Sequence, residues 1–556
     1  KGTIRDIPLK RLTFGTRSND GFTVKTEWDL PSLLGTDAID GLDLRVKLDY
    51  FEKRGTGFGL GAEYDFDNSI GEFDLYAIQD RGEDKTTSGK DIDQDGDWRG
   101  VALWEHTSNL PNGWKLQFQA SYISDETYID AWRPDDFESR RQYETSFYLQ
   151  QITANRAISI YTSYDINDFI SNDYLLASKG YTVDKLPETR FASYGNSWFD
   201  GKVTYSNEFR MSRMKFNFET HSENELGIRN GAYPTIGPNV PISDYHRARG
   251  LSSQYISRFD TRHEIAIPLK YDNLNFTPFL VGRFTAYSDD FEDFSGEDDD
   301  SRAFGAVGMR FSAQYQHVDN AVESSMFDLH RLRHIIEPNV TVWFGTSNVD
   351  QEDLPVYDTE VESLGTGTVV RAGLRNVWQT QRGGPGRWRS VDVLTLDAGV
   401  VYNSNDADRE SPTPQFFDYR PEYSQFGDHG YGSFALMLSD SLSFTGTGIY
   451  DIEESLLARG SIGTELRHSP LLTSYVEYRY IEAGTSKLLG VGFNYLITPK
   501  YKIAISPQWD LEEDDLRSIS ARLQRAFPDF TLTTRIRYDD IRDETTVSAS
   551  IDLIEF

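Results

Sequence analysis

A run of alternating aspartates is the feature of this sequence that most resembles a site for chemistry. Asp91, Asp93 and Asp95 precede Gly96, and the pattern D-x-D-x-D-G opens a calcium-binding loop. The twelfth position of such a loop should supply a bidentate glutamate, and here it is Ala102. The motif therefore predicts a weak cation site on the surface, and the plainer alternative is a solvated acidic loop.

The other patterns for metal or nucleophilic chemistry are incomplete. His330 and His334 have the i, i+4 spacing of two helical zinc ligands, but no glutamate lies between them. On a strand their rings would stand roughly 13 Å apart, too far to share one ion. The chain has no Cys and no G-x-S-x-G, so thiolate chemistry is excluded and no serine-hydrolase elbow is indicated. We predict no enzyme activity, no cofactor and no metal centre, although catalytic residues on separate strands would leave no motif.

The composition narrows the class of protein. The 556 residues carry a formal net charge of -32, which argues against a nucleic-acid partner because such binding needs clustered Lys and Arg. Aromatic residues make up 13% of a chain that is only 38% hydrophobic. No run of 18 apolar residues occurs, so no transmembrane helix is predicted. An aromatic yet polar chain fits a structure with one apolar face and one wet face.

Alternation of apolar and polar residues with a period of two runs through the whole sequence. In one segment Leu44, Val46 and Leu48 alternate with Arg45 and Lys47. Such segments are about 9–11 residues long, the length of a tilted strand that crosses a bilayer. In lipid every backbone group must be paired, so many such strands predict a large closed antiparallel transmembrane β-barrel of roughly 26 strands. The apolar set should face lipid, and the two cationic residues should face the lumen.

The connections between these segments alternate between short and long. Asp67–Gly71, Ala154-Asn155 and Tyr271–Asn275 are short. The long, mostly acidic ones are Asp80–Asp97, Asp125–Glu138, Asp165–Asp184, Ser222–Arg249, Asp289–Arg302 and Ser347–Glu362. Outer-membrane barrels have short periplasmic turns and long external loops, so we expect the aspartate run to lie outside.

A closed barrel requires the first strand to pair with the last. The first contains or follows Pro8, and the last spans Thr546–Leu553, where Val547, Ala549 and Ile551 share a face. Proline has no N–H and cannot donate to the ladder. Pro8 is therefore either an ordinary strand end or the sign of a deliberately weak seam.

Several of these strands resemble one family, the lipopolysaccharide-assembly outer-membrane proteins (LptD, or organic solvent tolerance protein). Ile7-Pro8, the turn at Arg17–Gly21 and the segment Gly21–Leu30 are similar to the family's first two barrel strands. Further pieces that resemble family strands and hairpins are Glu264-Ile265-Ala266-Ile267-Pro268-Leu269, Arg333-His334-Ile335-Ile336-Glu337-Pro338-Asn339-Val340, Gly373-Leu374-Arg375-Asn376 and Gln379-Thr380-Gln381-Arg382-Gly383.

The resemblance implies a translocon in the outer membrane of a Gram-negative bacterium. Such a barrel receives lipopolysaccharide from a periplasmic bridge of the LptA type, and a lipoprotein of the LptE type plugs its lumen. The lipid leaves sideways between the first and last strands. The resemblance thus makes Pro8, Val547, Ala549 and Ile551 candidate residues of a lateral gate. The alternative is another large outer-membrane channel or receptor barrel, of the uptake or porin type.

Three departures from the family pattern are visible. We expect residues 1–556 to form the barrel domain alone, without the periplasmic jelly-roll that usually precedes it. The family's cysteines, which link jelly-roll to barrel, are absent. The second strand, within Gly21–Leu30, has no proline, which leaves the details of a gate open.

Overall fold

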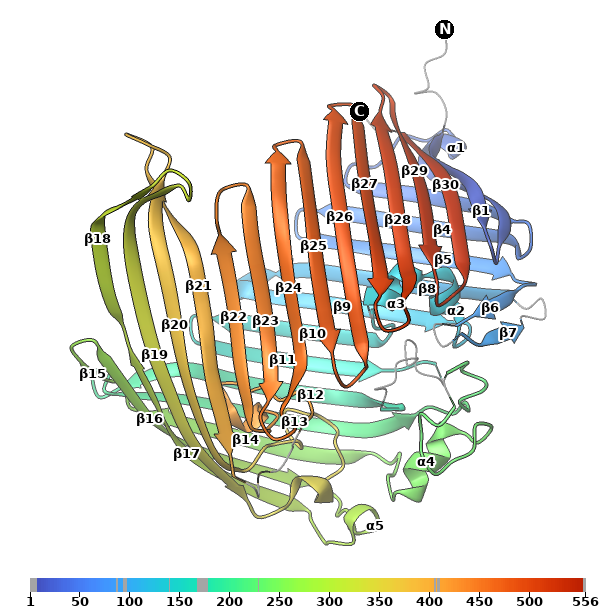
Figure 1. The fold of residues 1–556 in the computed structure, drawn as a ribbon. Coiled ribbons are helices and arrows are strands. Elements are labelled where there is room, and N and C mark those ends of the chain that lie inside the picture. The colour runs from blue at the N-terminus through green and yellow to red at the C-terminus, as the bar shows by residue number, and fades with distance from the viewer. Residues whose placement is uncertain are drawn as a thin grey trace.

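The protein folds into one closed antiparallel β-barrel in which the first strand, β1 (Leu9–Arg17), pairs with the last, β30 (Glu544–Leu553) (Figure 1). The computed structural model describes residues 8–86, 89–93, 98–139, 141–167, 179–228, 230–404, 407 and 411–553. The prediction of a large closed barrel is confirmed.

The strands follow one another along the chain with few interruptions. After β1 they are β2 (Gly21–Asp29), β3 (Leu42–Phe51), β4 (Gly55–Phe66), β5 (Ser69–Gln79), β6 (Glu83–Lys85), β7 (Asp91–Asp93), β8 (Trp98–Leu110), β9 (Trp114–Ile123), β10 (Thr145–Thr153), β11 (Arg156–Tyr164), β12 (Tyr181–Trp198), β13 (Val203–Phe218), β14 (Ile256–Ala266), β15 (Leu269–Tyr271), β16 (Leu274–Tyr287), β17 (Ser301–Ala313), β18 (Tyr315–Ser324), β19 (Leu329–Ser347), β20 (Gly367–Arg382), β21 (Arg389–Asn403), β22 (His429–Met437), β23 (Leu442–Asp451), β24 (Leu456–Ser469), β25 (Leu472–Ile481), β26 (Ser486–Thr498), β27 (Tyr501–Asp510), β28 (Asp515–Ala526), β29 (Phe530–Asp539) and β30.

The helices are short and lie in the connections. They are α1 (Leu30–Leu34), α2 (Tyr128–Trp132), α3 (Pro134–Ser139), α4 (Ile242–Ala248) and α5 (Glu292–Ser295), with single 3-10 turns η2 (Pro111–Gly113), η3 (Gln351–Asp353) and η4 (Pro421–Tyr423). Among the described residues, no helix has the length and apolar character needed to span a bilayer.

The main sheet has 28 strand segments, which form 26 barrel strands. The difference arises because two barrel strands are each interrupted once. β14 and β15 both pair with β16, and the break between them holds Pro268. β17 and β18 both pair with β19 and are separated by Gln314. The two remaining segments, β6 and β7, form a hairpin outside the barrel wall.

The two faces of the wall differ as the alternation predicts. Val46 lies opposite Leu60, which lies opposite Leu75, and both leucines are exposed, as expected of a lipid-facing surface. On the other face Lys47 forms an ion pair of 2.7 Å with Asp74, and Asp74 also binds a side chain of the loop that contains α2. Leu44 and Leu48 share the phase of Val46, so the predicted orientation of this segment matches the structure.

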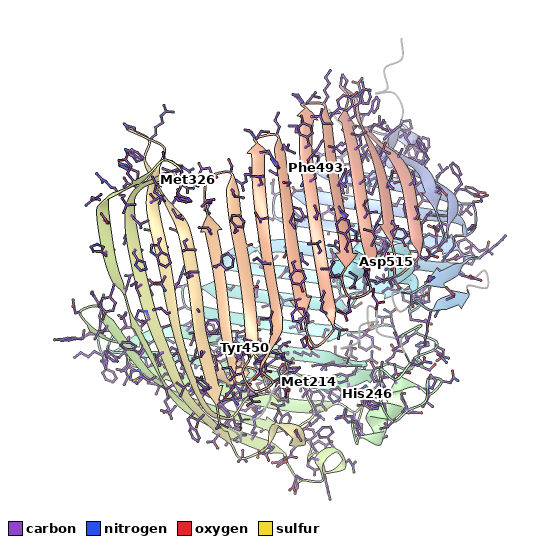
Figure 2. The ribbon with its side chains drawn as sticks, in the orientation of Figure 1. Met214, His246, Met326, Tyr450, Phe493 and Asp515 are labelled. Atoms are coloured by element: carbon purple, nitrogen blue, oxygen red, sulfur yellow. The ribbon has the colours of Figure 1, made fainter. Side chains whose placement is uncertain are left out.

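Most long connections gather at one end of the barrel, which we call the loop end. The other end, the turn end, has short turns and the longer connection 30–41, which contains α1. The loop end carries the hairpin β6–β7 and the helices α2 to α5 (Figure 1). Figure 2 shows Met214 and His246 toward the loop end and Met326 at the turn end. The described parts of all six predicted long connections lie at the loop end. A seventh, 404–428, was not predicted.

The buried apolar residues lie between the wall and the loops, because a single-layered barrel has no second sheet to pack against. These residues form three clusters. One joins β3, β5, β8 and β9 to α2 and to residues of 219–255. A second joins β16, β17, β19 and β20 to 404–428, and a third joins β13 to 348–366. The loop end of the lumen is therefore partly filled by the chain's own loops.

Candidate functional site: the lumen and the seam

Arginines on the inner wall bind acidic residues of the loop 348–366. Arg258 on β14 is fully buried and donates to Glu362 at 2.7 Å and to Asp358 at 2.6 Å. Burial alone would raise the pKa of the Asp358 carboxyl, but the charges of Arg258 and Lys185 outweigh it and hold that pKa below its usual value. The loop is thus fixed in the lumen by buried, fully charged contacts.

The loop 404–428 is held to the wall in the same way. Arg262 on β14 donates to Glu422 at 2.7 Å, and Arg371 on β20 binds Asp418. Arg420 of the loop donates back to Glu208 on β13 at 3.0 Å. A buried ion pair that loses one partner costs about 3–5 kcal/mol, so these loops stay in place unless several pairs open together.

The opposite wall has similar charges without such a cover. Arg467 on β24 and Arg479 on β25 pair only along their own strands, with Glu465 and Glu477, in the described contacts. Their side chains are 61% and 58% exposed, whereas Arg258 is 0% exposed. The lumen therefore has one side that is covered in part by loops and one side on which charged side chains are exposed.

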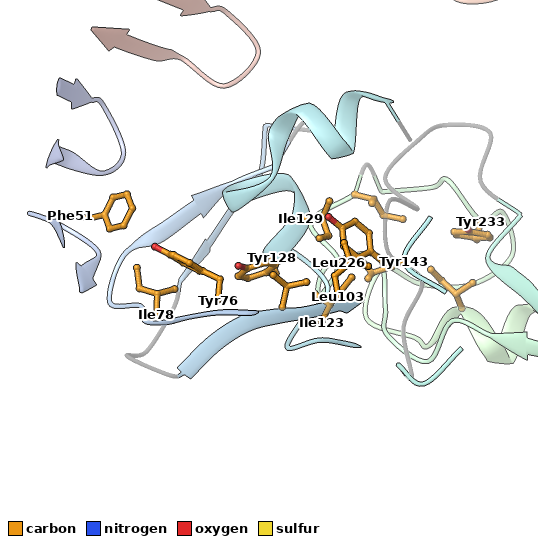
Figure 3. Packing of buried hydrophobic residues seen from close by; sticks show 13 residues of the cluster. Phe51, Tyr76, Ile78, Leu103, Ile123, Tyr128, Ile129, Tyr143, Leu226 and Tyr233 are labelled. Atoms are coloured by element: carbon orange, nitrogen blue, oxygen red, sulfur yellow. The ribbon is translucent and has the colours of Figure 1, made fainter. Parts of the chain in front are cut away.

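A third loop contact involves α2, which packs on the wall near the first strands. Tyr128 and Ile129 are buried against Tyr76, Leu103 and Ile123 (Figure 3). Around this cluster Arg54 binds Asp80 at 2.6 Å, and Arg99 binds Asp80 at 2.7 Å and Asp125 at 2.7 Å. Burial would raise the pKa of the Asp125 carboxyl, but hydrogen bonds and charge from Arg99 lower it overall.

The seam between β1 and β30 closes the barrel. Its paired residues run from Arg11 opposite Asp552 to Arg17 opposite Thr546. On the lumenal face the middle of the seam carries small residues, with Thr13 opposite Ser550 and Gly15 opposite Ser548. On the lipid face it carries Leu12, Phe14, Val547, Ala549 and Ile551. The alternation predicted for the last strand is present, and β30 begins two residues earlier than expected.

The strands approach closely in the middle of the seam. A methyl group added at Gly15 would lie 2.2 Å from the carbonyl oxygen of Val547 and 2.8 Å from the Cα of Ser548. Ion pairs close the two ends, with Arg11 donating to Asp552 at 2.5 Å and Arg17 lying 2.7 Å from Glu544. The pairing between β1 and β30 is therefore continuous, and at Gly15 it leaves no room for a larger side chain.

Pro8 lies just outside this paired stretch. It precedes β1, and its carbonyl oxygen accepts a hydrogen bond of 2.7 Å from the backbone N–H of Asp29, the last residue of β2. The seam pairing begins only at Arg11. A weakening of the seam by Pro8 therefore stays a prediction, as do the gate roles of Val547, Ala549 and Ile551.

The candidate cation loop falls partly outside the described residues. Asp91 and Asp93 lie on β7, where Asp91 is exposed and opposite Lys85, and Asp95 lies outside the described residues. Within the described part of the chain, no group of acidic or His side chains is arranged to hold a metal ion. The two histidines stack on different indoles, His330 on Trp388 and His334 on Trp378, as expected for side chains apart on one strand.

Sequence reasoning missed the residues that fill the loop end. Asp125–Glu138 was predicted only as a long polar connection, and the connection 404–428 was not predicted. Both carry buried aromatic residues, such as Tyr128 and Phe426, that pack against the wall. The signal was present, because large apolar side chains within a polar loop need a place to be buried. Their charged partners could not be chosen from sequence, since they lie on strands far along the chain.

The fold and the seam define a class of protein: a large outer-membrane β-barrel with a lumen partly closed by its own loops. The chain belongs to a particular family within it. The model of the family described as "LptD: LPS transport system D" matches residues 97–501 of the chain. The chain therefore belongs to this family of lipopolysaccharide-transport proteins of the Gram-negative outer membrane. That family is a transport family and not a known enzyme family.

Solved structures of other outer-membrane barrels are similar only in architecture. The FrpB iron transporter from Neisseria meningitidis is 8% identical, with a TM-score of 0.31, over 98% of this chain and 80% of that chain. The siderophore receptor PirA from Pseudomonas aeruginosa is 8% identical, with a TM-score of 0.29, over 98% of this chain and 79% of that chain. A porin of Rh. blastica is 11% identical, with a TM-score of 0.22, over 55% of this chain and 93% of that chain. No curated protein sequence matches the chain.

Proposed function

We propose that this barrel delivers lipopolysaccharide to the outer leaflet through a lateral gate between β1 and β30. The observation that carries the proposal is the seam itself, in a chain that belongs to a lipopolysaccharide-transport family. The first and last strands meet there without a covalent turn, so they can part without displacing a turn that links them. The gate residues are those of the two facing strands, with Val547, Ala549 and Ile551 on the lipid side and Pro8 at the entry to β1.

The two faces of the seam suit an amphipathic cargo. The saccharide of lipopolysaccharide is polar and needs a wet lumen, while its acyl chains need hydrocarbon. Hydroxyl side chains such as Thr13 and Ser550 line the lumenal side, and apolar side chains line the other. An opening between β1 and β30 lets one molecule occupy both solvents, and no covalent chemistry is required.

We further propose two protein partners. A lipoprotein of the LptE type occupies the lumen against the uncovered charges of β24 and β25, where Arg467 and Arg479 are mostly exposed. A periplasmic bridge of the LptA type supplies the lipid through the family's periplasmic jelly-roll domain. The acidic external loops face the phosphates of the surface lipopolysaccharide, and divalent ions shared between them would make that contact favourable.

A disulfide across the seam tests the route. Thr13 and Ser550 lie directly opposite each other, and the protein has no native Cys, so Thr13→Cys with Ser550→Cys gives a single defined bond. Oxidation should stop delivery of new lipopolysaccharide to the cell surface, and reduction should restore it. The matched control is Thr533→Cys with Ser550→Cys, which joins β29 to β30 and should leave delivery unchanged. Normal delivery with the seam fully crosslinked would exclude lateral exit between β1 and β30.

A further inference from the structure

The helix α2 contacts both sides of the seam at its loop end. Arg17 on β1 donates to the backbone carbonyl of Ala131 at 3.3 Å. Arg542, in the turn between β29 and β30, donates to the carbonyl of Asp130 at 3.1 Å and to the Asp130 carboxylate. Two neighbouring residues of one helix thus hold the two strands that close the barrel.

The helix is itself anchored to the wall. Trp132 stacks edge-on against Phe51 with ring centroids 4.9 Å apart and lies beneath the guanidinium of Arg54. Arg133, which follows α2, forms an ion pair with Asp74 on β5. A pull on the seam at Arg17 or Arg542 is therefore transmitted through α2 to the neighbouring strands.

The two ends of the seam are held very differently. At the turn end the ion pair between Arg11 and Asp552 is open to solvent, with side chains 51% and 37% exposed. At the loop end the side chains of Arg542 and Asp130 are only 8% and 3% exposed. Solvent competes with and screens the first pair, whereas separation of the second leaves a buried charge without its partner. The seam is thus weakest at the turn end and strongest at the loop end.

We propose that α2 is a latch on the loop end of the seam. While it holds Arg17 and Arg542 together, β1 and β30 separate only from the turn end, and the gate stays closed toward the outside. α2 releases one of the two arginines before a saccharide in the lumen passes to the cell surface. The inference deepens the proposed function and rests on it, because it takes the seam to be the lipid's exit.

A distance measurement across the seam tests the latch without relying on transport. Thr16 and Val547 lie opposite each other on the lipid face. Nitroxide labels at Thr16→Cys and Val547→Cys therefore report the separation of the two strands, measured by electron–electron double resonance in lipid nanodiscs. Asp130→Asn and Arg542→Gln should each produce a several-fold larger population at long distance. Glu422→Gln is the matched control, because it removes a buried ion pair between a loop and β14 away from the seam and should not change the distribution.

A tether gives the opposite perturbation. Asp130→Cys with Arg542→Cys, joined by a short bismaleimide, should keep the loop end closed and block appearance of new lipopolysaccharide on cells. Unchanged distances in both point variants, or unimpaired delivery with the tether complete, would overturn the latch. If Asp130→Asn does not fold, as judged by heat-modifiable gel mobility, Arg542→Gln and the tether decide. A wider seam in the variants, with delivery untouched by the disulfide between positions 13 and 550, would support the latch and refute the proposed exit route.

Discussion

Replacement of Val46 by arginine tests the placement of the wall in the bilayer. Val46 is in the middle of the ten residues of β3, opposite Trp28 and Leu60, on the face that carries exposed apolar side chains. That position corresponds to the middle of the hydrocarbon layer, where arginine on the lipid face of a barrel costs about 2–4 kcal/mol. Val46→Arg should therefore lower the free energy of unfolding by that amount.

The control has the same change on the other face. Thr445 on β23 is exposed, lies opposite Gly463 and shares the lumenal phase of Glu465 on β24, so Thr445→Arg places a guanidinium in water near a carboxylate. Its effect should stay within about 0.5 kcal/mol, as for an ordinary exposed position. The assay is urea titration of folding into phosphatidylcholine vesicles, followed by tryptophan fluorescence. Equal midpoints for the two variants would refute the assignment of the faces.

Three further outcomes are expected. Gly15→Ala should force the seam apart because the added methyl would lie 2.2 Å from the carbonyl oxygen of Val547, and it should raise entry of a large antibiotic far more than Gly61→Ala, which has room for a methyl. A maleimide should label Asp91→Cys on intact cells, and labelling only after the envelope is opened would reverse the topology. Burial, with the charge of Arg249, lowers the pKa of His246 in α4 to about 4, so the unfolded loop binds a proton first as the pH falls from about 6.5. The loop should therefore lose about 2–3 kcal/mol of stability between pH 7 and pH 4, which would be seen as faster proteolysis at low pH. His246→Gln should abolish this pH dependence.

The wall of the barrel could be predicted because the alternation within each strand shows which of its side chains face lipid and which face the lumen. Alternation at Leu44, Val46 and Leu48 assigns the two faces without any knowledge of the neighbouring strands. The last strand of the seam was located in the same way, whereas the first was placed around Pro8 from its position and the family resemblance. The count of roughly 26 strands agrees with the structure. A period of two is a local property of the backbone, so it survives whatever the strand pairs with.

The interior of the loop end could not be predicted because it depends on contacts across the sequence. Arg258 and Glu362 are 104 residues apart, and Asp130 and Arg542 are 412 residues apart. Loops have no periodic pattern from which the partners of these ion pairs could be predicted. The sequence shows only that a loop such as 124–144 carries tyrosine and tryptophan that need burial, which marks it as a loop that folds inward.

The connections also divide the barrel mechanically. The wall from β5 to β22 carries the long loops, whose buried ion pairs brace it from inside. After β22 the loop-end connections shrink to the four-residue turns 452–455, 482–485, 511–514 and 540–543. β30 thus belongs to a wall that, among the described contacts, is braced mainly by its own ladders. β1 is joined through β2 to β3 and, one strand further through β4, to β5, and α2 is anchored to β3 and β5. Because the less braced strand costs less to displace, opening of the seam should carry β30 and its neighbours outward while β1 stays with α2. Parting of the strands then breaks the contact between Arg542 and Asp130, and the contact between Arg17 and Ala131 is kept.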